Sequence, residues 1–318
     1  MLQRFNKFFD RISIVTLFLV MVLAAYFLAT EPIAYQKAMA LTSTPLPPTD
    51  WSEGQVLDAR AVIGAIPYRG SERVYDVLPQ VLYEKCILRG LGNCANKTRG
   101  LCFYLEQNGI PFERIDLIPL EGFLSGNGHT LVQTRFMLDG VSYVGVIDML
   151  EGAIPTFRGA PMDSNQFRVA VPHSISLATL NPRVDDSSDY YGSFLEAVAF
   201  GAVDGRSVAR YFRYLDAVHV SLGDARIERL FCSASAVVLG VFPMTHVTPA
   251  DYARLRGSSP RVFLAAHVLT WAARVFLVAV VLGALCRVFR FILRQVGQSL
   301  PHRLPVAGGS GQVSSNRA

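Results

Sequence analysis

The sequence predicts an α+β fold with an antiparallel sheet, an added helical segment and two flanking transmembrane helices. Three observations support this prediction. Apolar runs lie near both ends of the chain, Asp139-Gly140 is a strong hairpin signal, and apolar residues recur at helical spacing on both sides of that hairpin. A hydrophobic content of 51% exceeds that of ordinary soluble proteins, which assigns part of it to a membrane.

Two apolar runs are long enough to cross a bilayer. Residues 12–30 carry no charge, and roughly 20 apolar residues span the hydrocarbon layer. Residues 262–286 form the second run. Basic residues precede the first run and follow the second, so both chain ends are expected in the cytoplasm and residues 31–261 outside it. A cleaved signal peptide is the alternative for the first run, because residues 38–40 resemble a cleavage site.

The second run contains one arginine, Arg274. An arginine near the middle of a membrane helix costs about 2.5–3.5 kcal/mol on insertion scales, which the surrounding apolar residues can offset. Arg274 either faces a partner membrane protein or a lipid headgroup, or it snorkels to the membrane surface. Snorkelling is the simpler interpretation.

These features divide the chain into seven expected segments. In order they are a cytoplasmic N-terminus (1–11), a transmembrane helix (12–30), a linker rich in Pro, Thr and Ser (31–54), an α+β core (55–180), a helical extension (181–261), a transmembrane helix (262–286) and a basic, disordered cytoplasmic tail (287–318).

Composition excludes several classes of function. Outside the basic ends the chain is slightly acidic, which argues against a nucleic-acid partner. Its five cysteines have no CxxC spacing, so neither a zinc ribbon nor a disulfide scaffold is expected. The metalloprotease, P-loop and dinucleotide motifs HExxH, GxxxxGK[ST] and GxGxxG do not occur, and no metal or organic cofactor is implied.

Local patterns predict the elements of the core. Helical spacing covers residues 71–89 with an interruption at Pro79, residues 94–107, and most of residues 189–242. The apolar run 234–247 contains a proline and is shorter than a membrane span, so a buried helix is expected there. Residues 112–120 alternate as a strand does.

The hairpin around Asp139-Gly140 has a register that can be derived. A two-residue turn places Leu138 opposite Val141. His129 and Asp148 then lie on one face as diagonal neighbours, ~7–8 Å apart at the backbone, within reach of a hydrogen bond. The other face looks like core, with the pairs Val132–Ile147 and Phe136–Tyr143. A β-bulge would change this register.

Cys94 opens the helix expected at residues 94–107. The N-terminus of a helix presents unpaired N–H groups and the positive end of its dipole, both of which stabilise a thiolate. A nucleophilic cysteine also needs a base, and the base needs an orienting acceptor. Cys94, His129 and Asp148 can fill these three catalytic roles. Lys97 and Arg99 either favour the thiolate or form a solvated helix face.

The segments GNCANKTRGLCFYLEQNGIPFERIDL and GHTLVQTRFMLDGVSYVGVID resemble the core of the transglutaminase-like (papain-like cysteine) superfamily, in a bacterial membrane-anchored form. Members of that family have a Gly-x-Cys that opens a helix, a Gly-Ile-Pro after it, a His that begins a strand and an Asp that ends the next. Gly92, Cys94, residues 109–111, His129 and Asp148 match in order and approximate spacing.

This resemblance covers residues 85–155 and departs from the family at two places. Thr130-Leu131 follow the His where the family often has an aromatic residue, and Tyr143 is the nearest analogue of a Trp before the Asp. The sequence does not assign the group that would donate a hydrogen bond to the oxyanion. The backbone N–H of Cys94 is the first choice, with Gln80 and Asn93 as further candidates.

The resemblance implies an extracytoplasmic (periplasmic) cysteine hydrolase or acyl-transferase, protease-like or amidase-like, that is anchored in the inner membrane. Its substrate would be a protein, a peptide or another cell-envelope component. The alternative is a non-catalytic scaffold or partner subunit of a cell-envelope or polysaccharide assembly complex. Cys86 and Cys232 are expected in the core, or paired as a disulfide, and His173, His219 and His246 have no spacing typical of a site.

Overall fold

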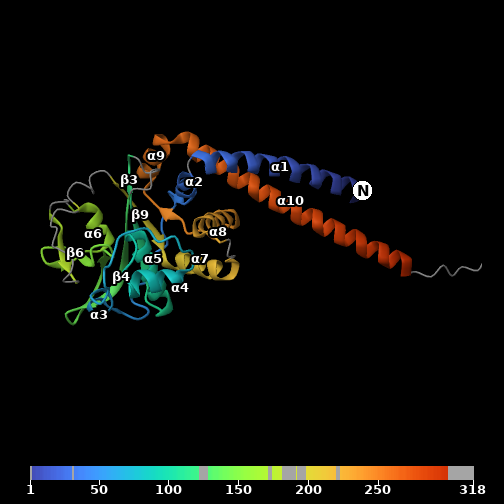
Figure 1. Cartoon of the computed structure of the whole chain (residues 1–318). Helices are drawn as coiled ribbons and strands as arrows, with labels where there is room; N and C mark the ends of the chain where they lie inside the picture. Colours follow the sequence, from blue (N-terminus) through green and yellow to red (C-terminus); the bar gives the residue numbers. More distant parts are fainter. Residues whose placement is uncertain are drawn as a thin grey trace, which may run out of the picture. The chain divides into compact units, whose positions relative to one another are not determined.

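The computed structural model describes residues 2–30, 32–121, 128–170, 174–180, 191, 198–219 and 223–299 (Figure 1). The chain forms two compact units. One consists of residues 19–274, and the other combines residues 1–18 with residues 275–318. The fold is mixed α and β, as the sequence predicts.

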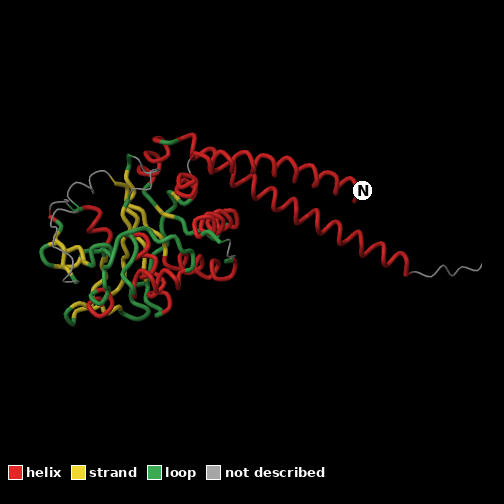
Figure 2. Tube along the Cα trace, viewed as in Figure 1, coloured by secondary structure: helices red, strands yellow, loops and turns green. Residues whose placement is uncertain are grey.

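Helices account for most of the described secondary structure (Figure 2). They are α1 (Leu2–Thr30), α2 (Pro32–Met39), α3 (Ala59–Ile63), α4 (Pro79–Leu82), the π-helix η1 (Tyr83–Leu88), α5 (Cys94–Gln107), α6 (Ser164–Val169), α7 (Gly205–Val218), α8 (Ala225–Leu239), α9 (Pro249–Ser258) and α10 (Pro260–Ser299).

The strands form two sheets. They are β1 (Leu41–Thr42), β2 (Leu57–Asp58), β3 (Phe112–Pro119), β4 (His129–Leu138), β5 (Val141–Ile147), β6 (Ala153–Phe157), β7 (Ala160–Pro161), β8 (Ser176–Thr179), β9 (Val198–Asp204) and β10 (Thr245–His246). The main sheet has the order β1-β10-β9-β3-β4-β2, with β5 also paired to β4, and the small sheet has the order β7-β6-β8. The β9-β3-β4-β5 part is antiparallel throughout.

The β4–β5 hairpin has the expected register. Leu138 pairs with Val141 and Phe136 with Tyr143, and no bulge interrupts the ladder up to Val132–Ile147. Asp139 and Gly140 both have positive φ, as a two-residue turn of this type requires. After Ile147 the strand leaves β4, and Asp148 forms a bridge with Ala153 instead of facing Leu131.

Both faces of the main sheet are covered. Helices α5 and α7 pack on one face, where Leu105, Val132 and Phe212 belong to one buried cluster. On the other face Leu131, Val146 and Phe167 of α6 form a second cluster. His129 therefore lies at the end of a strand that is buried on both sides, and the face that carries the His–Asp pair is packed as well.

Local sequence explains the limits of α5. The side chain of Asn93 caps the helix by accepting a hydrogen bond from the Asn96 backbone N–H at 3.1 Å. Gly109 follows the last turn with a φ of 61°, a conformation in which glycine is favoured. Gly92 also has positive φ, and a Cβ there would lie 2.8 Å from the Cβ of Asn96. The Gly-x-Cys sequence is thus required by the sharp entry into the helix.

The helix expected at residues 71–89 begins only at Pro79. Proline at the first helical position is favoured, whereas the residue before a proline is driven out of the helical region. Leu78 accordingly has a ψ of 128°, and residues 71–78 are not helical. The prediction was wrong for this first half.

The expected division between an α+β core and a helical extension at residues 181–261 also needs correction. Residues 198–204 form β9, a central strand between β3 and β10, so this part of the chain belongs to the main sheet. Its alternating buried residues fit a strand better than a helix. The remaining residues of the expected helix at 189–197, apart from Tyr191, lie outside the described part, whereas α7 and α8 are helical as expected.

Two other expected segments are more ordered than predicted. The linker at residues 31–54 contains α2 and β1, and its Ala38 and Leu41 are buried in a cluster with Phe263 and Leu269 of α10. The tail expected at residues 287–318 continues α10 to Ser299, because no proline occurs before Pro301. Residues 300–318 lie outside the described part.

Within the described residues, one helix is long and apolar enough to cross a membrane, the stretch Pro260–Leu293 of α10. The expected span 12–30 lies inside α1, where apolar side chains such as Ile14 and Phe18 are exposed. The side chains of residues 23–30 lie outside the described part, so a membrane crossing by α1 stays a prediction.

Arg274 has a partner within the chain. Its Nε donates a hydrogen bond to the carbonyl oxygen of Val238 at 3.0 Å, and its Nη2 donates one to that of Val237 at 3.2 Å. These carbonyls belong to the last turn of α8, which ends at Gly240 in the left-handed conformation. Arg274 therefore caps α8 instead of simply snorkelling. The run 234–247 is helical only up to Leu239.

We predict that Leu105→Ala destabilises residues 19–274 by about 2–5 kcal/mol, because a fully buried leucine is replaced by a cavity. Leu88→Ala is the matched control, since Leu88 is 58% exposed and its truncation should have little effect. The measurement is chemical unfolding of the detergent-solubilised protein followed by tryptophan fluorescence. Equal losses for the two variants would contradict the packing of α5.

Candidate active site

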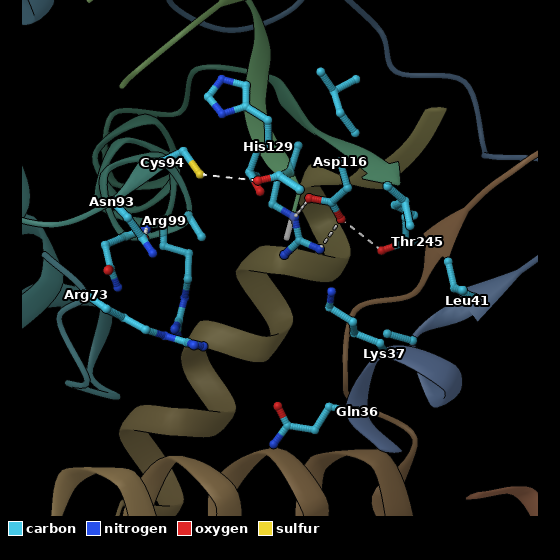
Figure 3. Close-up of a pocket in the computed structure, with 18 of the residues that line it drawn as sticks. Gln36, Lys37, Leu41, Arg73, Asn93, Cys94, Arg99, Asp116, His129 and Thr245 are labelled. Carbon is cyan, nitrogen blue, oxygen red and sulfur yellow. Dashed lines mark hydrogen bonds and ion pairs between the residues drawn. The ribbon is translucent and has the colours of Figure 1, made fainter. Parts of the chain in front are cut away.

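Cys94 is the first residue of α5 and lines a cavity of about 320 Å³ together with His129 (Figure 3). Its side chain is half-buried, and its Sγ lies 4.0 Å from the carbonyl oxygen of Gly128. Thr98, one turn further along α5, donates a hydrogen bond to the carbonyl oxygen of Thr130 at 2.9 Å. These two contacts hold the start of the helix against the start of β4.

His129 and Asp148 form the pair that the hairpin register predicts. The Nε2 of His129 lies 2.7 Å from the Oδ2 of Asp148, and both side chains are buried. The side chain of Cys94 lies near enough to the imidazole to help raise its pKa. The structure thus brings Cys94, His129 and Asp148 together in the expected order.

Asp148 has further partners that the sequence does not indicate. The hydroxyl of Tyr191 donates a hydrogen bond to Oδ2, and the backbone N–H groups of Leu150 and Glu151 donate to Oδ1 at 2.8 and 3.3 Å. Tyr191 is 2% exposed and packs edge-on against Phe167. Because it lies 43 residues from Asp148, no local pattern could have assigned it to the site.

The electrostatics of the pair follow from these contacts. Burial alone would raise the pKa of Asp148, but the charge and hydrogen bond of His129 and the bond from Tyr191 hold it below its usual value. Burial alone would lower the pKa of His129, but the Asp148 carboxylate and the Cys94 side chain raise it. The site therefore favours an imidazolium held by a carboxylate.

Lys97 and Arg99 do not form a solvated face. Lys97 is 2% exposed, and its ammonium lies 4.6 Å from the centre of the Tyr68 ring. Burial lowers the pKa of Lys97, whereas Glu151, Asp148 and Cys94 act in the opposite direction. Arg99 points to the cavity beside Cys94. The expectation of a solvated helix face is therefore wrong for these two cations.

The candidates for the oxyanion site differ in position. Asn93 lines the cavity, and because its Oδ1 accepts the capping bond of α5, its Nδ2 is the atom that could donate to an oxyanion. Gln80 is exposed, hydrogen-bonds to Glu84 at 3.2 Å and does not line the cavity. The backbone N–H of Cys94 occupies the first helical position, where an α-helix offers no internal acceptor. The backbone N–H of Cys94 and the Nδ2 of Asn93 are therefore the two candidate donors.

The other cysteines and histidines lie away from this arrangement. Cys86, Cys102 and Cys232 are buried thiols, and neither Cys86 nor Cys232 forms a disulfide. His219 pairs with Glu228 at 3.3 Å, and His246 contacts the carbonyl oxygen of Thr44 at 2.8 Å. His173 lies outside the described residues. In the part of the chain that the structure describes, no group of three or more His, Cys, Asp or Glu residues is placed to hold a metal ion.

Comparison of the chain with models of known protein families, with curated proteins and with solved structures finds no match. The resemblance to transglutaminase-like enzymes therefore depends on the motifs and on the geometry of this site.

We predict that Asp148→Asn lowers the free energy of unfolding by about 3–5 kcal/mol near pH 5, because it leaves His129 buried without its counter-charge. The lowered pKa of Asp148 contributes stability above pH 3.8, and this is lost as the pH falls through the folded value. The raised pKa of His129 contributes stability fully below pH 6.5, and this is lost as the pH rises through its folded value.

The difference between the two proteins should therefore be largest between pH 3.8 and 6.5, the ordinary values of the two groups, and shrink on either side. Chemical unfolding across this range measures it. Asp139→Asn serves as control, since the Asp139–Arg60 pair is exposed and should contribute little. A difference that does not vary with pH would contradict the charged state of the pair.

Proposed function

We propose that the chain is a membrane-anchored, extracytoplasmic cysteine hydrolase or acyl-transferase of transglutaminase-like type. The observation that carries this proposal is the buried His129–Asp148 contact of 2.7 Å beside a half-buried cysteine at a helix N-terminus, all at the edge of one cavity. The substrate class is an amide or related acyl group in a protein, a peptide or another cell-envelope molecule.

In the proposed reaction, the sulfur of Cys94 attacks the acyl carbon, and its proton resides on His129. The backbone N–H of Cys94 would stabilise the negative charge on the carbonyl oxygen. His129 then gives its proton to the leaving amine or alcohol as the bond to the acyl carbon breaks. Asp148 holds the imidazole in orientation and stabilises its positive charge, with Tyr191 fixing the carboxylate in turn.

The acyl group on Cys94 would next pass to water or to an acceptor amine, and His129 would take a proton from that acceptor. Hydrolysis is the default for a bacterial chain with this resemblance. Trapping the acyl-enzyme with water and with an added amine separates hydrolysis from cross-linking, because the two reactions share the intermediate.

The membrane location is part of the proposal. The apolar length of α10 supports one anchor, and the uncharged run at residues 12–30 supports a second. The basic residues at both ends support a cytoplasmic position for the termini and an extracytoplasmic position for the cavity.

The scaffold alternative loses one of its supports. It drew on Arg274 as a residue that could bind a partner in the membrane, but the guanidinium of Arg274 is engaged with the last carbonyls of α8. A scaffold also has no need for a buried His–Asp pair that costs desolvation energy. The enzyme is therefore the better-supported function.

We predict that iodoacetamide modifies Cys94 preferentially in the Cys286→Ser protein, because the other three cysteines of that protein are buried. His129→Ala should slow this modification about tenfold or more, because the thiol loses the group that accepts its proton. Mass spectrometry of tryptic peptides over time measures both rates. His219→Ala is the matched control, since His219 pairs with Glu228 and does not line the cavity.

A Cys94 that reacts equally fast with and without His129 would contradict the catalytic role. In cells, Cys94→Ala should cause the same loss of function as deletion of the whole protein. Full function of this variant would instead favour the scaffold.

A further inference from the structure

The cavity beside Cys94 is strongly basic. Its lining includes five cationic side chains and one acidic side chain: Lys37, Arg73, Arg99, Arg114 and Arg229, against Asp116. In Figure 3, Arg73 and Arg99 enter the cavity from the side of α5, and Lys37 enters from the side of α2. The rest of the exported segment is slightly acidic, so this concentration of positive charge is local.

The one acidic residue is already neutralised. Asp116 accepts two hydrogen bonds from the guanidinium of Arg114, at 3.0 and 2.8 Å, and a third from the hydroxyl of Thr245 at 3.0 Å. This fork-to-fork geometry is the strongest ion pair available to the two side chains. Arg73, Arg99 and Arg229 therefore face the cavity, and the described residues that line it include no carboxylate other than Asp116.

Arg229 of α8 shows the effect of this excess most clearly. Burial, and then the positive charges of Arg99 and Arg73, lower its pKa to about 9. The neighbours that oppose this shift are the hydroxyl groups of Tyr211 and Tyr75, not carboxylates. Like charges that are held together in a partly buried space repel, and the folded protein bears that cost.

Arg229 also carries a buried hydrogen-bond donor without an acceptor. Its Nη1 is inaccessible to solvent and has no hydrogen-bond partner in the described part of the chain. An unsatisfied buried donor costs about 1–3 kcal/mol, more if charged, and natural proteins keep few of them. Arg229 nevertheless lines the cavity through other atoms of its side chain, and an oxyanion there would offset the repulsion between the cations.

We propose that this cavity binds a phosphate-type oxyanion with at least two negative charges, which forms part of the substrate whose acyl carbon reacts with Cys94. Arginine forks suit the geometry of phosphate oxygens, and a singly charged carboxylate would leave most of the positive charge uncompensated. The volume of about 320 Å³ accommodates such a group together with the neighbouring acyl part. The assignment to the substrate depends on the proposed function, whereas anion binding itself does not.

The segments that supply the cations are far apart in sequence. Lys37 lies on α2, Arg73 before α4, Arg99 on α5 and Arg229 on α8. Each comes from a different part of the chain that borders the cavity. The site is therefore a product of the tertiary fold, and the proximity of Arg99 to Cys94 in the sequence accounts for only one of its members.

The test is isothermal titration calorimetry of the detergent-solubilised Cys94→Ser protein with pyrophosphate, inorganic phosphate and succinate. We expect pyrophosphate to bind most tightly and succinate least tightly. Arg229→Gln should weaken the binding of pyrophosphate at least tenfold, and Arg210→Gln, an exposed arginine of α7 outside the cavity, should leave it unchanged. Arg99→Gln gives a second variant if Arg229→Gln does not fold.

Equal binding of pyrophosphate by the Arg229, Arg99 and Arg210 variants would overturn the proposal, as would tighter binding of succinate than of pyrophosphate. A titration with dihexanoyl phosphatidic acid separates the two sources of a phosphate. Tighter binding of this lipid than of pyrophosphate assigns a lipid headgroup, and weaker binding assigns a water-soluble phosphate compound. Because the titrated protein lacks the Cys94 thiol, an unreactive cysteine would contradict the proposed function without affecting this result.

Discussion

The buried contact between His129 and Asp148 is the interaction on which the candidate site depends. It exists because β4 and β5 are joined by a tight turn whose register fixes which residues share a face. The departure of the chain after Ile147 then lets the carboxylate turn toward the ring and collect hydrogen bonds from Tyr191 and two backbone N–H groups. A charged pair so deep in the protein carries a desolvation cost, which these hydrogen bonds offset.

Negative and positive charges lie on opposite sides of the imidazole of His129. Negative charge is concentrated behind the imidazole, on Asp148, and positive charge lies on the cavity side, on Arg99 and its neighbours. A group with negative charge is attracted to the cavity side of the pair.

Much of this site follows from local sequence, and the rest does not. The limits of α5, the hairpin turn and the His–Asp pair depend on residues close together in the chain, so caps, glycines and strand alternation were enough to predict them. Tyr191, Arg73 and Arg229 reach the site through long-range packing, which no pattern around them records. The strand β9 was missed because residues 198–203 are all apolar or glycine, so the alternation of its buried residues is not visible in the sequence. The start of α4 was misjudged because Pro79 begins that helix instead of interrupting a longer one.

The capping of α8 by Arg274 bears on how the domain can be handled in isolation. Phe263 and Leu269 are buried against α2 and its surroundings, and Arg274 closes the last turn of α8. A truncation placed before residue 262, where the apolar run begins, would remove Phe263 and Leu269 from the hydrophobic cluster and take from the carbonyl of Val238 its hydrogen bond to Arg274. A fragment of the domain has to retain α10 through Arg274. The first four turns of this long apolar helix are a structural part of the domain that holds the cavity.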